Sequence, residues 1–394
     1  MAMNKTIETL GRRLRLGVIG GGPGSFIGEV HRTAARLDDN FEIVAGVLSS
    51  DAGRSRAAGR AIGLAAERAY GGPDEMFKAE AQRPDGIEVV AIMTPNDSHH
   101  PLCAQALARR LDVICDKPLT RSLADALDLV ARVREAGVVF CNTFNYAAFP
   151  MVRQARAMAR TGDLGDIRMV HVEYVQGHNA GLTPGERGEE ALNWHFRSDK
   201  SGPSLILADI GSHAHHMASF VTGLGFEKVC ADVRTTVPGR NSHDYAGILF
   251  ELANGAPGMI WVTQAAAGAV HGLHFRVFGA KAGLEWFQEE PNRLIVTRLG
   301  EPALTLERGG PGLKAEARRA ERTGIGHPEG YQEAFAALYA DVAEAIVARR
   351  TGRAANPPAL DFPTVEDGAR TMKFIEAALA STRSGGWVDC RLAL

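Results

Sequence analysis

Short apolar runs alternate with segments of helical spacing along the first third of the chain, from Leu14 to about Asn142. The runs are rich in β-branched residues, which is typical of buried strands, and the segments between them have helical periodicity. Repeated strand and helix units of this kind predict a parallel sheet covered by helices. In chain order they are "RLGVIG", "GEVHRTAARL", "FEIVAGVLS", "SRAAGRAIG", "VVAIMTP", "HPLCAQALARR", "DVICDKP", "SLADALDLVARVREAG" and "VVFCNTF".

One of these helices has clear boundaries. Ser122 is a suitable N-cap and Gly137 stands where a helix usually ends, so the spacing predicts a helix over 122–136. The first domain is expected to close soon afterwards. We therefore expect a dinucleotide-binding domain over residues 1–142 and a substrate-binding and oligomerisation domain over 143–394, whose C-terminal helices can pack back on the first.

The pattern after residue 142 is different, because longer strand-like runs replace the regular alternation. Turn signals at Asn254-Gly255 and Ala282-Gly283 separate several of these runs, which predicts an antiparallel sheet of the α+β kind. The polar segment "LERGGPGLKAEARRAERTGIGHPEG" is expected to be a surface loop. Expected helices are 151–160, 207–222, 330–350 and 364–383; expected strands include "RMVHVEYVQGH", "VCADVRTTV", "YAGILFELANGAPGMIWVTQAA", "HGLHFRVFGAKAGLEWF" and "NRLIVTRLG".

Composition excludes several classes of function. The 394 residues are 45% hydrophobic and 23% charged with a net charge of -2, so no basic surface for nucleic acid or anionic lipid is expected. Neither a signal peptide nor an apolar run of the roughly 20 residues needed to span a membrane is present. The five cysteines are scattered without CxxC spacing, which argues against disulfides and thiolate metal sites and favours the cytoplasm.

The stretch "GGGPGSFIG" follows the first predicted strand and resembles a lengthened cofactor loop. The usual fingerprint G-x-G-x-x-G has two residues between its second and third glycines, whereas five separate Gly22 from Gly28. A plain glycine-rich turn is the alternative. Because the loop opens the first strand and helix unit, where a helix N-terminus can hold a pyrophosphate, cofactor binding is favoured, with Ser25 as a hydroxyl for the phosphates.

The end of the second strand normally carries the acid that binds the adenosine ribose. Asp51 is the candidate in "GVLSSDAGRSR". Two alternatives stay open: Asp51 caps the next helix, or Ser49, Ser50 and Arg54 surround a 2′-phosphate. With Asp51 as the acid that binds the ribose, NAD is favoured over NADP.

Two further polar motifs follow strands of the predicted parallel sheet. Thr94, Asn96 and His99 come after "VVAIM", and Asp116-Lys117 come after "DVIC". Ligands bind at the carboxyl ends of such strands, so a lysine there is better placed for chemistry than one on a helix face, although a solvated charge is the simpler alternative.

A third motif, "LADIGSHAHH", lies in the predicted helix over 207–222. Asp209 and His213 are four residues apart and share a helical face, with His216 one turn further along. An aspartate in this position can orient an imidazole that accepts a proton. Helix capping by Asp209 and a histidine metal site are the alternatives, but the spacing matches no common zinc pattern.

With the glycine loop, "TPNDSHH", "CDKPLT", "FNYAAFP" and "DIGSHAHH" in this order, the chain resembles the glucose-fructose oxidoreductase, inositol dehydrogenase and rhizopine catabolism (Gfo/Idh/MocA) family over almost its whole length. The resemblance implies an α/β protein: an N-terminal Rossmann domain plus a C-terminal α+β domain with a large, mostly antiparallel open sheet. It also implies a homo-oligomer, a dimer or tetramer. Asp116 replaces the family's usual glutamate, Ala147 its arginine, and His216 its trailing aspartate.

Carried over residue by residue, the resemblance implies a catalytic set of Lys117, Asp209 and His213 and no metal. Cofactor contacts are expected from Gly20, Gly22, Ser25, Phe26, Ile27, Ser49, Ser50, Asp51, Arg54, Thr94, Asn96, His99, Asp116 and Lys117. Substrate contacts are expected from Lys117, Asn145, Tyr146, His178, Trp194, Asp209, His213 and His327.

The implied reaction is hydride transfer between NAD and a carbon bearing a hydroxyl on a sugar, inositol or related polyol. In this hypothesis His213 accepts the hydroxyl proton, Asp209 orients its ring, and Lys117 hydrogen-bonds the same oxygen. Two alternatives remain. Some relatives retain NAD and cleave glycosides, which needs an additional base that the sequence does not mark, and a non-catalytic sensor of nicotinamide or sugar would not need the three residues.

Overall fold

A computed structural model describes residues 4–394 and divides the chain into two compact units. The first unit contains the residues up to Leu119 together with Ala124–Asn145 and Tyr331–Val365. The second contains Thr120–Leu123, Tyr146–Gly330 and Glu366–Leu394. Each unit is therefore built from segments that are distant in the sequence.

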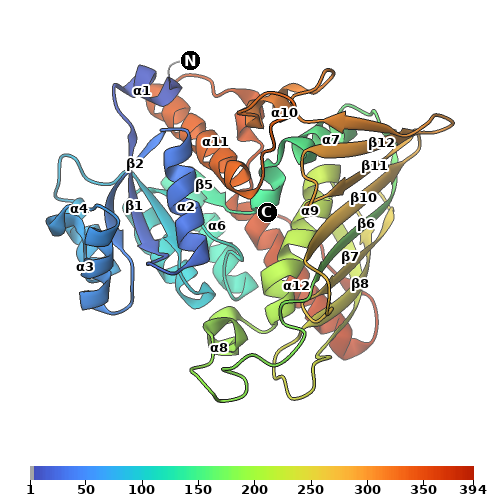
Figure 1. Ribbon diagram of the computed structural model, residues 1–394, viewed down its shortest axis with the longest axis horizontal. Coiled ribbons are helices and arrows are strands. Elements are labelled where there is room, and N and C mark those ends of the chain that lie inside the picture. The colour runs from blue at the N-terminus through green and yellow to red at the C-terminus, as the bar shows by residue number, and fades with distance from the viewer. Residues whose placement is uncertain (1–3) are drawn as a thin grey trace. The chain divides into compact units, whose positions relative to one another are not determined.

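The sheet of the first unit has five parallel strands in the order β2-β1-β3-β4-β5 (Figure 1). The order reverses at β1, and such a switch point marks the ligand edge of an open α/β sheet. The predicted parallel sheet is confirmed. Its strands are β1 (Leu14–Gly20), β2 (Phe41–Val47), β3 (Val89–Met93), β4 (Asp112–Cys115) and β5 (Phe140–Asn142). Its helices are α1 (Lys5–Leu10), α2 (Phe26–Leu37), α3 (Ala52–Ala61), α4 (Pro73–Glu80), α5 (His99–Ala108), α6 (Leu123–Ala136) and α11 (Tyr331–Thr351).

Helix α11 joins the first unit from far along the chain and packs on α2, as the orange and blue helices of Figure 1 show. The Tyr339 hydroxyl of α11 lies 2.8 Å from Nδ1 of the buried His31. The Phe335 ring, also from α11, meets the same imidazole at 5.1 Å between centroids. Because the contacts are buried and aromatic, α11 forms part of the core of this unit.

The second unit is built on a nine-stranded sheet in the order β13-β12-β11-β10-β6-β9-β8-β7-β14. Strands β6 and β9 are parallel and all other neighbours are antiparallel, which confirms the predicted mostly antiparallel sheet. The strands are β6 (Ile167–Gln176), β7 (Phe226–Arg234), β8 (Tyr245–Leu252), β9 (Pro257–Thr263), β10 (His271–Gly279), β11 (Ala282–Phe287), β12 (Arg293–Arg298), β13 (Leu304–Glu307) and β14 (Val388–Asp389).

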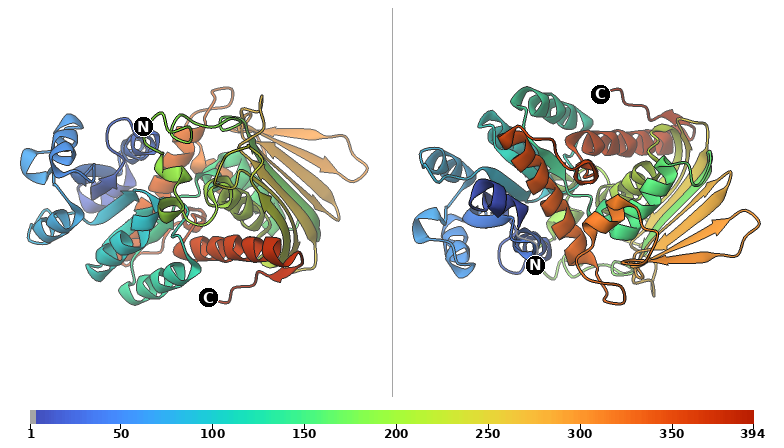
Figure 2. Two further views of the ribbon diagram at one scale, coloured as in Figure 1. Left: turned by 90° about the horizontal axis from the view of Figure 1, so that it is seen from below. Right: turned by 90° about the horizontal axis from the view of Figure 1, so that it is seen from above.

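Helices cover one face of this sheet, and Figure 2 shows the other face without a helical layer. Alternate residues of β6, such as Val172 and Tyr174, are buried on the covered face, together with Phe275 and Trp286 from neighbouring strands. The helices of this unit are α7 (Pro150–Arg160), α8 (Ser198–Ser201), α9 (Ser212–Thr222), α10 (Ala315–Ala320) and α12 (Val365–Ser384). None of the helices in residues 4–394 combines the length and apolar character that crossing a membrane requires.

Two local predictions were wrong. Ala282-Gly283 is not a turn, because both residues lie in β11 and Gly283 pairs with Phe278. The Phe278 ring lies 3.1 Å from the position of a Cβ on Gly283, so the glycine makes room for that ring. The expected surface loop after residue 306 contains helix α10, which packs on α7 and buries Ala317.

Candidate functional site

The glycine loop of the first unit is packed too closely to carry side chains. Gly20 and Gly21 have φ angles of +86° and +63°, which L side chains rarely adopt. A Cβ on Gly22 would lie 2.2 Å from the Leu48 carbonyl oxygen, and one on Gly28 would lie 2.1 Å from that of Gly21. These glycines bring the ends of β1 and β2 against the N-terminus of α2, as in a pyrophosphate cradle.

Helix α2 begins directly at this loop. The Ser25 hydroxyl caps it by accepting the Gly28 N–H at 3.2 Å. Phe26 is exposed at the first helical position, and Ile27 beside it is half-buried. Because the N-terminus of a helix favours anions, these residues surround a suitable place for a diphosphate.

The polar residues after β2 stand at the start of α3, where Asp51 and Arg54 are exposed and Ser49 is half-buried. Asp51 caps α3, accepting the Arg54 N–H at 2.7 Å, and the Ser49 hydroxyl accepts the Asp51 N–H at 3.2 Å. The Arg54 guanidinium lies 3.7 Å from the Asp51 carboxylate. The capping alternative for Asp51 is therefore observed, and Ser50 is exposed beside it.

His99 connects the ends of β3 and β4. Its ring is 1% exposed, with Nδ1 2.9 Å from the Pro118 carbonyl oxygen and Nε2 2.9 Å from that of Thr94. A neutral imidazole has one N–H and donates to one of these two carbonyls. Asn96 is buried in the short 3₁₀ turn Asn96–Ser98, between Thr94 and His99 in the sequence. The sequence predicted a cofactor contact for His99 but not this bracing of the two strand ends.

The backbone that carries Lys117 is held by neighbouring side chains. The Asp116 carboxylate accepts the Lys117 N–H at 2.8 Å and the Thr143 hydroxyl at 2.9 Å. The buried Asn142 amide donates to the carbonyl oxygens of Cys115 and Asp116, at 3.1 and 3.0 Å. The loop is thus fixed at the carboxyl end of β4. The sequence singled out Asp116 and Lys117 but missed Asn142 and Thr143.

In the second unit, Asp209 and His213 lie at a change of helical geometry. Residues Leu207–Gly211 form a π turn, closed by the Ser212 N–H donating to the Leu207 carbonyl, before α9 begins. The predicted helix over 207–222 is present, but its first five residues have π geometry in place of α geometry. The Ser212 hydroxyl also donates to the Ala208 carbonyl at 2.9 Å, which supports the wider turn. Such π turns are frequent at functional sites.

A cluster of hydroxyl and imidazole groups adjoins His213. The Tyr146 ring meets the His213 ring edge-on, with 4.7 Å between centroids. The Tyr146 and Tyr174 hydroxyls lie 2.6 Å apart, and Nε2 of His271 lies 2.6 Å from that of Tyr174 and 3.2 Å from that of Tyr146. Burial, Tyr174 and Asp209 raise the pKa of Tyr146 well above its usual value, so its hydroxyl stays protonated.

The cluster continues through two glutamines to Asp209. Nε2 of Gln176 lies 2.9 Å from Nδ1 of His271. Nε2 of Gln264 donates to the Asp209 carboxylate at 2.6 Å and to Oε1 of Gln176 at 3.3 Å. We call the six residues Asp209, Gln264, Gln176, His271, Tyr174 and Tyr146 the polar array. Sequence reasoning missed Gln264, Gln176, His271 and Tyr174. The one signal in the sequence is that Tyr174 and Gln176, at the end of β6, are polar although their positions face inward.

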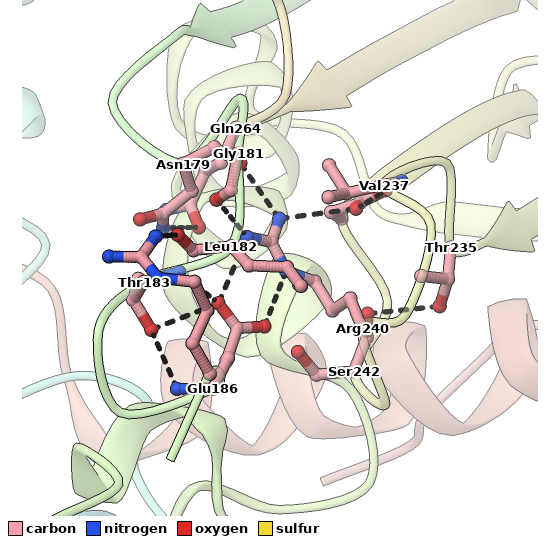
Figure 3. A network of polar contacts seen from close by, with 12 residues as sticks. Asn179, Gly181, Leu182, Thr183, Glu186, Thr235, Val237, Arg240, Ser242 and Gln264 are labelled. Carbon is pink, nitrogen blue, oxygen red and sulfur yellow. Dashed lines mark hydrogen bonds and ion pairs between the residues drawn. The ribbon is translucent and has the colours of Figure 1, made fainter. Parts of the chain in front are cut away.

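A buried ion-pair network supports this end of the sheet (Figure 3). The Arg240 side chain is fully buried and donates to the Glu186 carboxylate at 2.8 Å and to Asp244 at 3.2 Å. It also donates to the Asn179 and Gly181 carbonyls, at 2.8 and 2.7 Å. Arg240 thereby fixes the loop after β6, whose Asn179 amide donates to Gln264 at 3.1 Å.

The other expected substrate residues are more dispersed. His178 is exposed just after β6, and Trp194 is half-buried and stacked on His195 at 3.7 Å between centroids. His327 is exposed in the loop before α11. Asn145 is buried at the end of the first unit.

Two histidines that follow His213 belong to the core of the second unit. Burial lowers the pKa of His215 to about 3 and that of His216 to about 4, so both rings are neutral. His215 lies against Phe374. Within residues 4–394, no group of three or more His, Cys, Asp or Glu side chains is arranged to hold a metal ion.

A Rossmann unit with a glycine cradle, together with a unit built on a large sheet, defines a dinucleotide-binding class of protein. Residues 14–144 match the family model of the oxidoreductase family with an NAD-binding Rossmann fold, and residues 152–285 match the GFO/IDH/MocA C-terminal domain. The uncharacterized oxidoreductase YfiI of Bacillus subtilis is 34% identical over 96% of this chain and 98% of its own length.

Solved structures give the same result. An oxidoreductase from Sinorhizobium meliloti is 42% identical with a TM-score of 0.86, covering 96% of this chain and 100% of that one. An inositol dehydrogenase homologue from Azotobacter vinelandii, complexed with NADH and myo-inositol, is 35% identical with a TM-score of 0.87, covering 96% and 98%. The chain belongs to the Gfo/Idh/MocA family of oxidoreductases, and NAD is the cofactor of its Rossmann unit.

Proposed function

We propose that the chain is an NAD-dependent dehydrogenase that oxidises a ring hydroxyl of an inositol, sugar or related polyol to the ketone or lactone. The observation that carries the proposal is the anchored lysine. Lys117 stands at the carboxyl end of β4, in the same unit as the glycine cradle, on a backbone held by Asp116. The Azotobacter relative, complexed with NADH and myo-inositol, supports a polyol substrate.

NAD, when bound, supplies the hydride acceptor. In our proposal the glycine loop and the N-terminus of α2 hold its diphosphate, and the residues from Ser49 to Arg54 lie along its adenosine end. Lys117 donates a hydrogen bond to the substrate oxygen as negative charge develops on it. His213 accepts the hydroxyl proton, and Asp209 stabilises the resulting imidazolium.

The direct test is the absorbance of reduced nicotinamide when the purified protein meets NAD or NADP with inositols, aldoses and glycosides. We expect reduction of NAD with at least one inositol or aldose. Release of an aglycone without net reduction would instead identify the NAD-retaining glycosidase. Cofactor binding with neither outcome would reject the dehydrogenase proposal and favour the sensor.

We also propose that the chain forms a homo-oligomer through the uncovered face of the nine-stranded sheet. Most antiparallel sheets present polar side chains on a solvated face. Here that face carries large apolar side chains that are 37–51% exposed, as expected of an interface. They are Met169, Leu249, Met259, Trp261, Phe278 and Phe287.

Replacing Met259 and Trp261 together with arginine should shift the protein to a smaller species in analytical ultracentrifugation, because two charges would be buried without partners. The control is Leu299→Arg, since Leu299 is 84% exposed at the end of β12. A wild-type monomer, or an unchanged assembly in the double variant, would contradict this interface.

The cellular compartment is proposed from the free-thiol state of the cysteines. Cys103, Cys115, Cys141, Cys230 and Cys390 are free thiols. Free thiols are usual in a reducing compartment, so we propose that the enzyme is cytoplasmic.

A further inference from the structure

The hydrogens of the polar array can be assigned in one direction, beginning at Asp209. As a carboxylate, Asp209 has no hydrogen to donate, so the Gln264 group 2.6 Å away must be its NH₂. Asn179 supports the same orientation, because its amide donates to the opposite oxygen of Gln264 at 3.1 Å. The Asn179 backbone N–H also donates to the Gln264 carbonyl, which fixes the two residues together.

The orientation of Gln264 determines that of Gln176. The second N–H of Gln264 faces Gln176 at 3.3 Å, so the Gln176 atom there must be the carbonyl oxygen. The NH₂ group of Gln176 then faces Nδ1 of His271 at 2.9 Å and donates to it. Nδ1 of His271 is therefore an acceptor without a hydrogen.

The orientation of Gln176 in turn determines the tautomer of His271. Burial and the neighbouring His178 lower the pKa of His271, while Glu289 and Asp209 act in the opposite direction. The neutral ring therefore carries its hydrogen on Nε2, which donates to the Tyr174 oxygen at 2.6 Å.

The last step is between the two tyrosines. One hydroxyl hydrogen lies between the two tyrosine oxygens, which are 2.6 Å apart, and we assign it to Tyr174, whose oxygen is the nearer of the two to the Nε2–H of His271. The Tyr146 hydroxyl accepts from Tyr174 and so presents its own hydrogen to its further surroundings as a donor.

Reversing this direction would be costly. Tyr174, Gln176 and Gln264 are each at most 3% exposed, so water cannot replace a lost hydrogen bond among them. Turning either glutamine or changing the tautomer of His271 places two donors or two acceptors against each other, and a buried unsatisfied group costs about 1–3 kcal/mol. The charge of Asp209 thus determines that the Tyr146 hydroxyl, at the other end of the polar array, acts as a donor.

We propose that the polar array makes Tyr146 a fixed hydrogen-bond donor, and that this donor selects a polyol with an acceptor oxygen adjacent to the hydroxyl that is oxidised. His213, whose ring contacts Tyr146, accepts a proton, whereas Tyr146 donates a hydrogen bond. Together they distinguish two neighbouring oxygens of a substrate. Gln176, Gln264, His271 and Tyr174 are positioning residues. The substrate part rests on the proposed function, but the assignment of hydrogens does not.

The assignment of hydrogens is tested by ¹⁵N NMR of the full chain with labelled histidine, without any substrate. Loss of one signal in a His271→Asn variant identifies the resonance. We expect His271 at neutral pH as the Nε2–H tautomer with an unprotonated Nδ1. An Nδ1–H tautomer or an imidazolium would overturn the proposal.

A matched pair of variants tests the cause. In Gln176→Glu the carboxylate facing Nδ1 accepts only, so His271 should become Nδ1–H or doubly protonated. Gln82→Glu makes the same chemical change at an exposed position and should leave the tautomer unaltered. An unchanged His271 in Gln176→Glu would overturn the directional array.

The substrate part is tested by kinetics with NAD and myo-inositol. Tyr146→Phe removes the donor, and Gln176→Glu reverses it, so each should raise KM by roughly two- to tenfold with a smaller change in kcat. The KM of the double variant should be no higher than that of the more impaired single variant, because both changes remove the same interaction. An unchanged KM in both overturns the selection of an acceptor oxygen. If the wild type shows no turnover, that result counts against the proposed function. The polar array is then tested by the His271 tautomer alone.

Discussion

Replacing Lys117 with methionine is expected to lower kcat by about 10²–10³-fold, the usual loss when a donor to a developing oxyanion is removed. Methionine keeps most of the apolar stem but cannot donate a hydrogen bond. The glycine cradle is unaltered, so the dissociation constant for NADH, measured by fluorescence titration, should stay within about threefold of the wild-type value. This change is smaller than the loss of one typical hydrogen bond would cause.

The matched control for this variant is Lys78→Met, which removes an exposed ammonium group from α4 of the same unit. Its kcat should equal that of the wild type. If Lys117→Met retains near-normal turnover, the lysine has no direct role in the reaction and the proposed mechanism is wrong. If it loses NADH binding instead, Lys117 serves the cofactor and not the substrate oxygen.

Replacing His213 with alanine is expected to lower kcat by about 10²–10⁴-fold, the usual contribution of a general base. Because the change leaves a space beside Tyr146, added imidazole should restore part of the activity. The measurement is kcat with increasing imidazole at constant pH. A structural role alone would give no dependence on imidazole.

His100→Ala is the control for the same measurement, because His100 pairs with Asp128 at 2.7 Å in the first unit, outside the proposed catalytic set. Its kcat should be unchanged and insensitive to imidazole. Full activity of His213→Ala would assign the proton transfer to another group.

The sequence predicted those parts of the fold that depend on local pattern. Buried runs such as Val89–Met93 have a strand signal of their own, and Gly137, with a φ of +63°, ends α6 as expected. The π turn at Leu207–Gly211 escaped prediction because periodicity over 207–222 fits a continuous α-helix equally well. Gly283 was predicted as a turn residue, because a glycine that makes room for a neighbouring ring cannot be distinguished in the sequence from one that makes a turn.

The same difference between local and non-local signals applies to the residues of the site. Lys117 was found because its position after a strand is a local feature. His271 and Gln176 were missed because their proximity depends on the register of β10 against β6, where these two residues pair directly. That register is set by the packing of the whole sheet and has no local signature. The bracing of Thr94 and Pro118 by His99 likewise follows from the order of strands β3 and β4.

The contact between α2 and α11 determines when the NAD-binding unit can exist during protein synthesis. The ribosome makes α2 early, but the Tyr339 hydroxyl that meets His31 and the Phe335 ring beside it belong to a helix made more than 290 residues later than α2. Nearly the whole second unit is translated in between. Although domains usually fold in order from the N-terminus, this one must wait with an uncovered face, exposed to proteases and chaperones, until α11 has emerged. A fragment ending at Asn145 is for the same reason an incomplete cofactor domain.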